Sequence, residues 1–91
     1  EGFIDLVFET EEGLVVVDYK TDGGETPEEI AVSMGRYRLQ GGTYALALER
    51  ATARTVSKVV FLFLHTGSEV VMEDLPGAMK EVQSAVESLV S

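Results

Sequence analysis

Two strand-like runs at the beginning of the chain constrain its fold more than any other feature. Residues 2–9 and 14–20 are rich in aromatic and β-branched side chains, and the turn-forming segment Thr10-Glu11-Glu12-Gly13 separates them. This pattern predicts a β-hairpin. Both runs are almost continuously apolar instead of alternating, which is typical of strands covered on both faces. We therefore expect the hairpin to lie centrally in its sheet, with other elements packed on each side.

The next part of the chain predicts helical structure. Thr26-Pro27-Glu28-Glu29 combines an N-cap residue, a proline at the first helical position and an acidic first turn, which indicates the start of a short helix. Residues 35–54 carry apolar and aromatic residues at helical spacing and predict a longer helix. Gly41-Gly42 is its weak point, because a glycine costs a helix roughly 1 kcal/mol relative to alanine.

The last third of the chain predicts two strands and a helix. Residues 56–65 contain an apolar run that is too short for an isolated helix and rich in β-forming residues, so we expect a buried strand. A turn at residues 66–68 precedes an expected edge strand at residues 69–73 and a helix at residues 76–90. The predicted order is β-β-α-β-β-α, and the expected fold class is α/β (α+β).

Length and composition limit what the chain can be. Ninety-one residues with 45% apolar content make one domain, and a chain of this length buries only roughly 60–65% of its unfolded surface. Because the sequence starts directly in a strand-like run, we expect residues 1–91 to be a single domain truncated from a larger protein. The chain has no cysteine, which excludes disulfides and iron–sulfur ligands within these residues. No apolar stretch approaches the roughly 18 residues that cross a bilayer, and we take the cytoplasm as the default location.

The formal net charge is −9. This charge argues against a free-standing nucleic-acid-binding domain, because such domains usually carry basic patches that neutralise phosphates. A divalent cation held by carboxylates would offset part of the charge locally, and other domains of a longer protein would supply the remaining phosphate contacts.

The hairpin brings two acidic residues together. If the turn is centred after Glu11, the numbers of paired residues sum to 23, and Asp5 lies opposite Asp18. Directly opposed residues have Cβ atoms about 5 Å apart, and two carboxylates at that separation repel by roughly 3 kcal/mol at an effective dielectric constant of about 20. Lys20 follows Asp18 by two positions and shares its face. We expect a cluster of two acids and a base on an otherwise apolar face.

Such a cluster suits phosphodiester chemistry. Mg²⁺ prefers oxygen ligands, usually one or two carboxylates together with water and substrate phosphate, and Asp5 and Asp18 offer two carboxylates. A nearby ammonium such as that of Lys20 can orient a water molecule or offset charge in the transition state. The alternative is a plain salt-bridge network at the end of the sheet, because two acids and a lysine also occur together by accident.

Three motifs in order make the pattern more specific. The chain carries a G-x-x-D strand at Gly2–Asp5, a D-Y-K strand at Asp18–Lys20 and a Q-x-x-x-Y helix at Gln40–Tyr44. Over residues 2–64 it resembles the PD-(D/E)XK nuclease domain of RecB-type and AddA-type helicase–nucleases. The resemblance implies a restriction-endonuclease-like core, in which helices flank a central mixed β-sheet.

The resemblance also implies roles for individual residues. Asp5 and Asp18 would bind Mg²⁺, or Mn²⁺ instead, with the backbone carbonyl of Tyr19 as a further ligand, and Lys20 would be catalytic together with both aspartates. The residues expected to contact DNA or to support the site are Gln40, Tyr44 and Thr21. The alternative for Gln40 and Tyr44 is packing against the core, since their i, i+4 spacing places both side chains on one helix face.

The implied activity is that of a Mg²⁺-dependent, exonuclease-type deoxyribonuclease, part of a helicase–nuclease in DNA end processing and recombinational repair. Its expected partners are DNA, helicase domains of the same chain and a second subunit, with no membrane. Family members usually have an additional His or Glu ligand well upstream of the first aspartate, so we expect residues 1–91 alone to be inactive. Two alternatives stay open: an inactive nuclease-like module that holds DNA or packs between domains, and a stand-alone junction-resolving or restriction-like nuclease.

Overall fold

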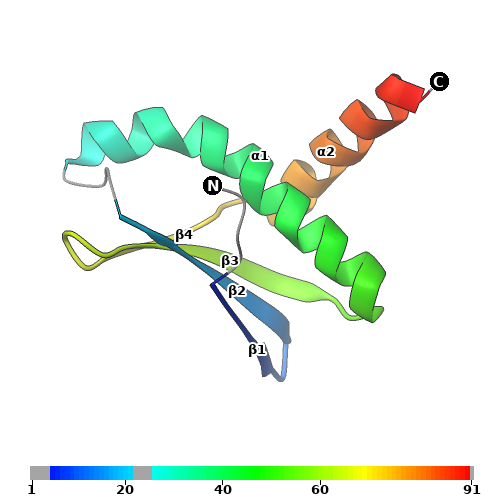
Figure 1. Cartoon of the computed structure of the whole chain (residues 1–91), viewed down its shortest axis with the longest axis horizontal. Helices are drawn as coiled ribbons and strands as arrows, with labels where there is room; N and C mark the ends of the chain where they lie inside the picture. The colour runs from blue at the N-terminus through cyan, green and yellow to red at the C-terminus, as the bar shows by residue number, and fades with distance from the viewer. Residues whose placement is uncertain (1–4, 22–25, 91) are drawn as a thin grey trace.

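The computed structural model describes residues 5–21 and 26–90. In chain order the elements are β1 (Leu6–Thr10), β2 (Gly13–Lys20), α1 (Pro27–Thr52), β3 (Val56–Phe63), β4 (Ser68–Val71) and α2 (Leu75–Val90). The strands form one sheet in the order β1-β2-β3-β4, so β1 is an edge strand and the expectation that the hairpin lies centrally holds for β2 alone. The β2 and β3 strands are parallel, and the two outer pairs are antiparallel. Both helices lie on the same side of this sheet (Figure 1). The predicted element order and the mixed sheet are confirmed.

The β1–β2 hairpin has the register that the sequence predicts. In every pair of its ladder the two residue numbers sum to 23. The Thr10 hydroxyl donates a 2.9 Å hydrogen bond to the Gly13 carbonyl and thereby closes the turn. Asp5 immediately precedes β1, and its N–H donates to the Val17 carbonyl (3.2 Å). Residues 2–4 of the predicted first strand lie outside the described residues.

The β3 strand places aromatic residues beside the end of β2. These two strands run parallel and α1 connects them, because parallel neighbours need a long crossover. Phe61 is paired with Asp18, and Phe63 is paired with Lys20. Paired residues of neighbouring strands project to the same face. Each charged residue of β2 therefore has a phenylalanine as its neighbour under α1.

The α1 helix is continuous over 26 residues, so the prediction of a separate short helix before residue 35 is wrong. Its start has a capping box, in which Thr26 Oγ1 accepts from the Glu29 N–H (3.1 Å) and the Glu29 carboxylate accepts from the Thr26 N–H (3.2 Å). These two bonds satisfy backbone donors that a helix start leaves unpaired. Ile30 and Met34 then pack against the same core as the later turns, which joins the two predicted pieces into one helix.

Gly41 and Gly42 allow α1 to approach its neighbours closely. A Cβ at Gly42 would lie 2.9 Å from the Ala78 carbonyl oxygen of α2 and 3.1 Å from Val82 Cγ2. A Cβ at Gly41 would collide with the sulfur of Met72. The glycine pair lowers helix propensity, as the sequence indicates, but it permits packing that a side chain would prevent.

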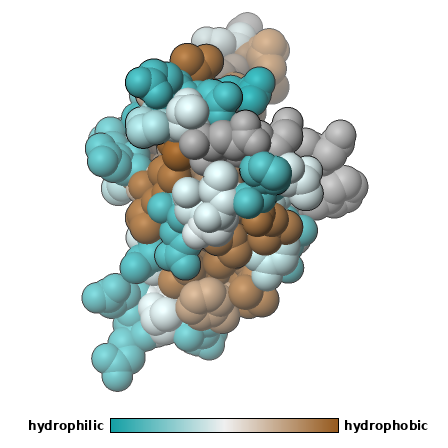
Figure 2. All heavy atoms as spheres, turned by 90° about the vertical axis from the view of Figure 1, so that its left-hand side faces the viewer, coloured by the Kyte–Doolittle hydropathy of each residue, from teal (hydrophilic) through white to brown (hydrophobic). Residues whose placement is uncertain are grey.

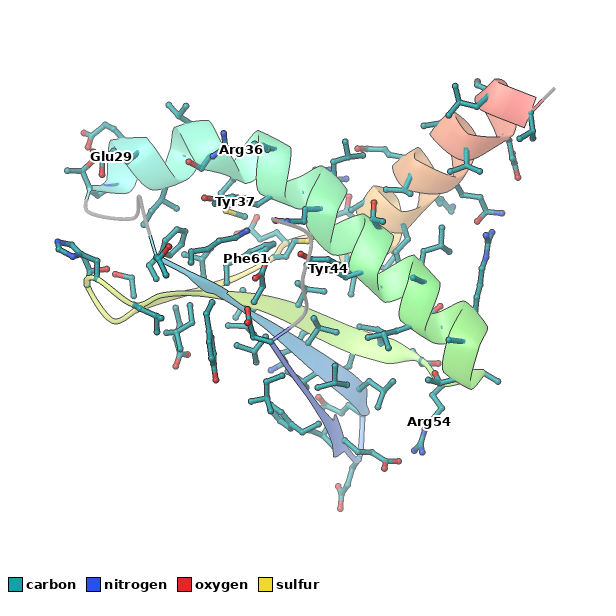
Figure 3. All side chains as sticks on the ribbon, viewed as in Figure 1. Glu29, Arg36, Tyr37, Tyr44, Arg54 and Phe61 are labelled. Carbon is teal, nitrogen blue, oxygen red and sulfur yellow. The ribbon has the colours of Figure 1, made fainter. Side chains whose placement is uncertain are left out.

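The core lies between α1 and the sheet. Its largest fully buried side chains are Phe61, Phe63, Val16 and Val59. Figure 3 shows Tyr37 and Tyr44 projecting from α1 toward the sheet and Phe61 lying beneath them. Within the described residues, no helix combines the length and the apolar character that a membrane span needs.

The opposite face of the sheet is uncovered within the described residues, so the expectation of packing on both faces is wrong for this part of the chain. Leu6, Phe8 and Tyr19 are 44%, 45% and 40% exposed there. A groove of about 430 Å³ crosses this face and is lined by side chains from all four strands. Seen from the left-hand side of Figure 1, apolar surface is visible among the polar side chains (Figure 2). The apolar pattern of β2 correctly indicates an apolar second face, but no second layer of this chain covers it among residues 5–21 and 26–90.

Candidate active site

The end of β2 holds two charged residues on the face that α1 covers. Asp18 is 3% exposed and Lys20 is 9% exposed. One residue separates them along the strand, so both side chains project to the same side. Charged side chains are rarely buried to this extent unless they are paired. Their position under α1 therefore requires partners from neighbouring elements.

Lys20 has contacts with both the strand and the helix. Its Nζ lies 3.0 Å from Asp18 Oδ2 and donates a 2.7 Å hydrogen bond to Gln40 Oε1. The centre of the Tyr37 ring lies 4.4 Å from Nζ. Together these contacts hold the ammonium in one place between β2 and α1.

One oxygen of Asp18 lacks a hydrogen bond. Oδ2 is buried and accepts none from the described residues, since its 3.0 Å contact with Lys20 Nζ is an ion pair without well-directed hydrogen-bond geometry. A buried carboxylate oxygen normally has a hydrogen-bond donor or a metal ion beside it. Apart from the Lys20 ammonium, no hydrogen-bond donor of the described residues serves this oxygen, so it could accept a further ligand.

Asp5 lies beside β2, just before β1 begins. It is exposed, and its Oδ2 accepts a 2.8 Å hydrogen bond from the Tyr19 N–H. The N–H and C=O of one strand residue point to the same edge of the strand. The Lys20 carbonyl faces the other edge, where it accepts from the Leu64 N–H (2.9 Å). The Tyr19 carbonyl is therefore directed to the edge where Asp5 lies.

The two aspartates interact electrostatically. Burial raises the pKa of Asp18 above its ordinary value, the neighbouring Lys20 ammonium opposes this rise, and the Asp5 carboxyl group adds to it. The contribution of Asp5 indicates that the two carboxyl groups are close neighbours, although Asp5 itself lies just outside the β1–β2 ladder. A cation between them would relieve both the desolvation and the repulsion.

Gln40 and Tyr44 meet this cluster from α1. Burial raises the pKa of Tyr44 to about 12, and the Asp18 carboxylate adds to the rise through its charge and hydrogen bonding. The charge of Asp5 acts in the same direction, and the Gln40 side chain acts against it. Gln40 and Tyr44 of α1 are thus brought to the same site as the charged residues of β2, from which they are separate in the sequence.

Comparisons with known proteins identify the family. The family model of the PD-(D/E)XK nuclease superfamily matches residues 1–91. The chain belongs to this superfamily. Over 64 residues, or 69% of the chain, it is 48% identical to an ATP-dependent helicase/nuclease subunit of Clostridium botulinum strain 657. Over 69 residues, or 76% of the chain, it is 38% identical to the protein of the same name from Clostridium novyi strain NT.

The similarity is to a small part of these relatives. The chain spans about 5% of the length of the curated relatives it matches. No solved structure matches the chain significantly. The predicted resemblance to helicase–nucleases is confirmed, and the mixed four-stranded sheet with two helices is consistent with the predicted restriction-endonuclease-like fold.

In this member of the PD-(D/E)XK nuclease superfamily, Tyr37 touches the site, although no role was predicted for it from the sequence. Its ring contacts the Lys20 ammonium, and its place three residues before Gln40 puts both on one helix face. That spacing was the available signal, but an aromatic residue at helical spacing usually indicates core packing. Thr21, a predicted site residue, is exposed directly after β2 and outside the buried cluster.

Oxygen atoms of Asp5, Asp18 and Tyr19 could form part of the shell of a metal ion. Within the described residues there is no group of three or more His, Cys, Asp or Glu side chains suited to hold a metal. Asp5, Asp18 and the Tyr19 carbonyl offer oxygen atoms alone, which suits a hard cation. Mg²⁺ typically keeps several waters and takes substrate phosphate as a further ligand, so a shell of this size fits it.

Proposed function

We propose that this chain carries most of the catalytic site of a Mg²⁺-dependent DNA nuclease, centred on Asp5, Asp18 and Lys20. The nuclease would be part of a larger helicase–nuclease, as the names and lengths of the relatives suggest. We assign it an exonuclease-type activity in DNA end processing and recombinational repair. Its partners would be DNA, helicase domains of the same chain and a second subunit, and its location the cytoplasm.

The metal site in this proposal uses oxygen atoms from three residues. Asp5, Asp18 and the Tyr19 carbonyl would hold Mg²⁺, or Mn²⁺ in its place, and a His or Glu from outside residues 1–91 would complete the protein ligands. The buried Asp18 Oδ2, which accepts no hydrogen bond from the described residues, supports this assignment. Once bound, such a cation supplies positive charge that stabilises the scissile phosphate in the transition state.

The remaining residues position and stabilise the reacting groups. The Lys20 ammonium would orient the attacking water or offset charge on the phosphate. Gln40 holds this ammonium through its 2.7 Å hydrogen bond. The Tyr44 hydroxyl stays protonated at neutral pH because its pKa is about 12, so it is a hydrogen-bond donor for Asp18 or for a DNA phosphate.

The observation that carries the proposal is that Lys20 has a hydrogen-bond partner besides Asp18, whereas the buried Asp18 Oδ2 accepts no hydrogen bond from the part of the chain that the structure describes. In a plain salt-bridge network, the favourable arrangement satisfies both buried groups with hydrogen bonds. Here Lys20 also bonds to Gln40, whereas the buried Asp18 Oδ2 has only its ion pair with Lys20 and accepts no well-directed hydrogen bond from the described residues, and the pKa of Asp18 is raised. An oxygen left without a hydrogen bond in this way suits a carboxylate that binds a cation.

The net charge of −9 favours a second candidate function. An inactive nuclease-like module that packs between domains would not need to approach DNA phosphates closely. However, a buried aspartate beside a second acid costs stability, and such a module would gain nothing from keeping it. We therefore rank this function second.

Lys20→Ala and Asp18→Ala in the full-length helicase–nuclease test the proposal. We expect Mg²⁺-dependent DNA digestion to fall by at least about a hundredfold in each variant, while ATP hydrolysis is unchanged. Lys58→Ala is the matched control, because Lys58 is an exposed lysine on the uncovered face of the sheet. Normal digestion by the Lys20 variant would contradict the proposal.

We also expect the 91-residue chain alone to be inactive, because the proposed metal shell is incomplete. Efficient Mg²⁺-dependent cleavage of DNA by this chain alone would show that no further protein ligand is needed.

A further inference from the structure

We propose that Tyr37 is a positioning residue for Lys20, whose aromatic face holds the ammonium beside Asp18 and Gln40. This inference rests on the proposed nuclease function, in which Lys20 acts on the water or the phosphate. It adds a residue that lies outside the motifs identified in the sequence.

The contact is close and buried. Lys20 Nζ lies 4.4 Å from the centre of the Tyr37 ring, well inside the range of about 6 Å for an attractive cation–π interaction. Tyr37 is 5% exposed and Lys20 is 9% exposed. Cation–π attraction is strongest where water is excluded, so burial favours a large contribution here.

The ring itself is held rigidly by β3. Tyr37 stacks on Phe61 with a centroid distance of 5.1 Å and an interplanar angle of 29°. It also lies against Phe63, at 6.0 Å and 46°. Both phenylalanines are fully buried. A ring fixed on two sides can restrict where the ammonium lies.

An aromatic face has an advantage over a third oxygen ligand at this place. The ammonium of Lys20 already has Asp18 and Gln40 beside it. A further carboxylate would neutralise its charge and compete for it with a DNA phosphate, whereas a ring attracts the cation and adds no net charge. Tyr37 thus fixes Lys20 in position and leaves its positive charge available.

Chemical labelling of lysines in the metal-free full-length protein tests the contact without relying on activity. We would compare the wild type with Tyr37→Phe, Tyr37→Leu and a variant with pentafluorophenylalanine at position 37. Reductive methylation followed by mass spectrometry would report the labelling rate of Lys20, with exposed Lys58 as the internal reference. The phenyl ring keeps the attraction, and the fluorinated ring keeps the shape but loses the negative face.

We expect the Lys20 labelling rate in Tyr37→Phe to stay within about twofold of wild type, and to rise about tenfold with leucine or the fluorinated ring, which corresponds to losing a desolvated cation–π contact. The kcat of DNA digestion should fall by a similar factor in the same two variants, with KM for DNA and ATP hydrolysis unchanged. Equal labelling and equal kcat for phenylalanine and its fluorinated form would show that the ring only fills space, and would overturn the inference.

The Lys20→Ala variant separates the two ideas. If that variant digests DNA normally, the proposed function fails. If it loses digestion while the Tyr37 series shows no trend, only the role of Tyr37 fails.

Discussion

The two faces of β2 come from one short sequence but have different surroundings. Under α1, Val16 is fully buried, and Asp18 and Lys20 continue its face into the covered layer. On the other face, Tyr19 is 40% exposed and borders the groove that crosses the sheet. The covered face therefore carries the buried charged cluster, and the uncovered face carries mostly apolar side chains together with exposed charged ones such as Lys58.

In the proposed function, this burial would serve the chemistry of the site as well as stability. Charges interact more strongly where water is excluded, and the α1 layer excludes it from Asp18 and Lys20. The price of that arrangement is the desolvation that raises the pKa of Asp18. The uncovered face gives no such setting, because no helix of the described residues lies over it and its charged side chains, such as Lys58, are exposed.

The largest expected effect is on stability at the covered face. Phe61→Ala in the 91-residue chain should lower the free energy of unfolding by about 3–5 kcal/mol, because it leaves a cavity in a closely packed core. Phe61 is fully buried and stacks on Tyr37. Urea denaturation would measure the loss, and a decrease below about 1 kcal/mol would mean that α1 does not pack on β3 as described.

A smaller effect is expected where α1 meets α2. Gly42→Ala should destabilise the chain by about 1–3 kcal/mol through overpacking, because the new Cβ would lie 2.9 Å from the Ala78 carbonyl oxygen. Gly35→Ala is the matched control in the same helix, since a Cβ there meets nothing within 4 Å. It should stabilise the chain by roughly 0.5–1 kcal/mol. Equal shifts of the melting temperature in the two variants would contradict the close helix contact.

Substitution on the uncovered face should change stability least. Phe8→Thr, at a side chain that is 45% exposed, should cost about 1 kcal/mol or less in the 91-residue chain. It should also reduce binding of a dye that reports exposed apolar surface. A loss as large as that of Phe61→Ala would erase the difference between the two faces.

The pH dependence of stability gives the finest test of the covered site. The pKa of Asp18 is raised in the folded chain above its ordinary value of 3.8, so its contribution to stability is fully present below that value and is lost as pH rises through the raised pKa. Without metal, the wild type should therefore lose stability relative to Asp18→Asn over this range. Denaturation of both chains at a series of pH values would measure the difference, and a gap that stays constant with pH would contradict the raised pKa.

Part of this structure could be predicted from the sequence because it depends on short-range rules. The turn at Thr10 and Gly13 fixes the hairpin register as far as the Leu6–Val17 pair, and Asp5, the next residue, then lies beside β2 near Asp18. Helical spacing likewise places Gln40 and Tyr44 on one face. Such relations follow from strand and helix periodicity.

Other features depend on which elements meet, and periodicity does not reveal that. The first turns of α1 join the longer helix because Ile30 and Met34 reach the core. Tyr37 meets Lys20 because β3 lies parallel to β2 and supports the ring. The uncovered face of the sheet has the same apolar pattern that a covered face would have, so the pattern alone could not predict which face α1 takes.

The central claim is that Asp5 and Asp18 hold a catalytic metal ion beside Lys20. Crystals of the full-length protein soaked in Mn²⁺, with anomalous diffraction to locate the ion, would test it most directly. We predict an anomalous peak about 2.0–2.6 Å from carboxylate oxygens of both aspartates and from the Tyr19 carbonyl, and no peak at this place in Asp18→Ala. An ion bound elsewhere, or one that persists unchanged in that variant, would contradict the claim.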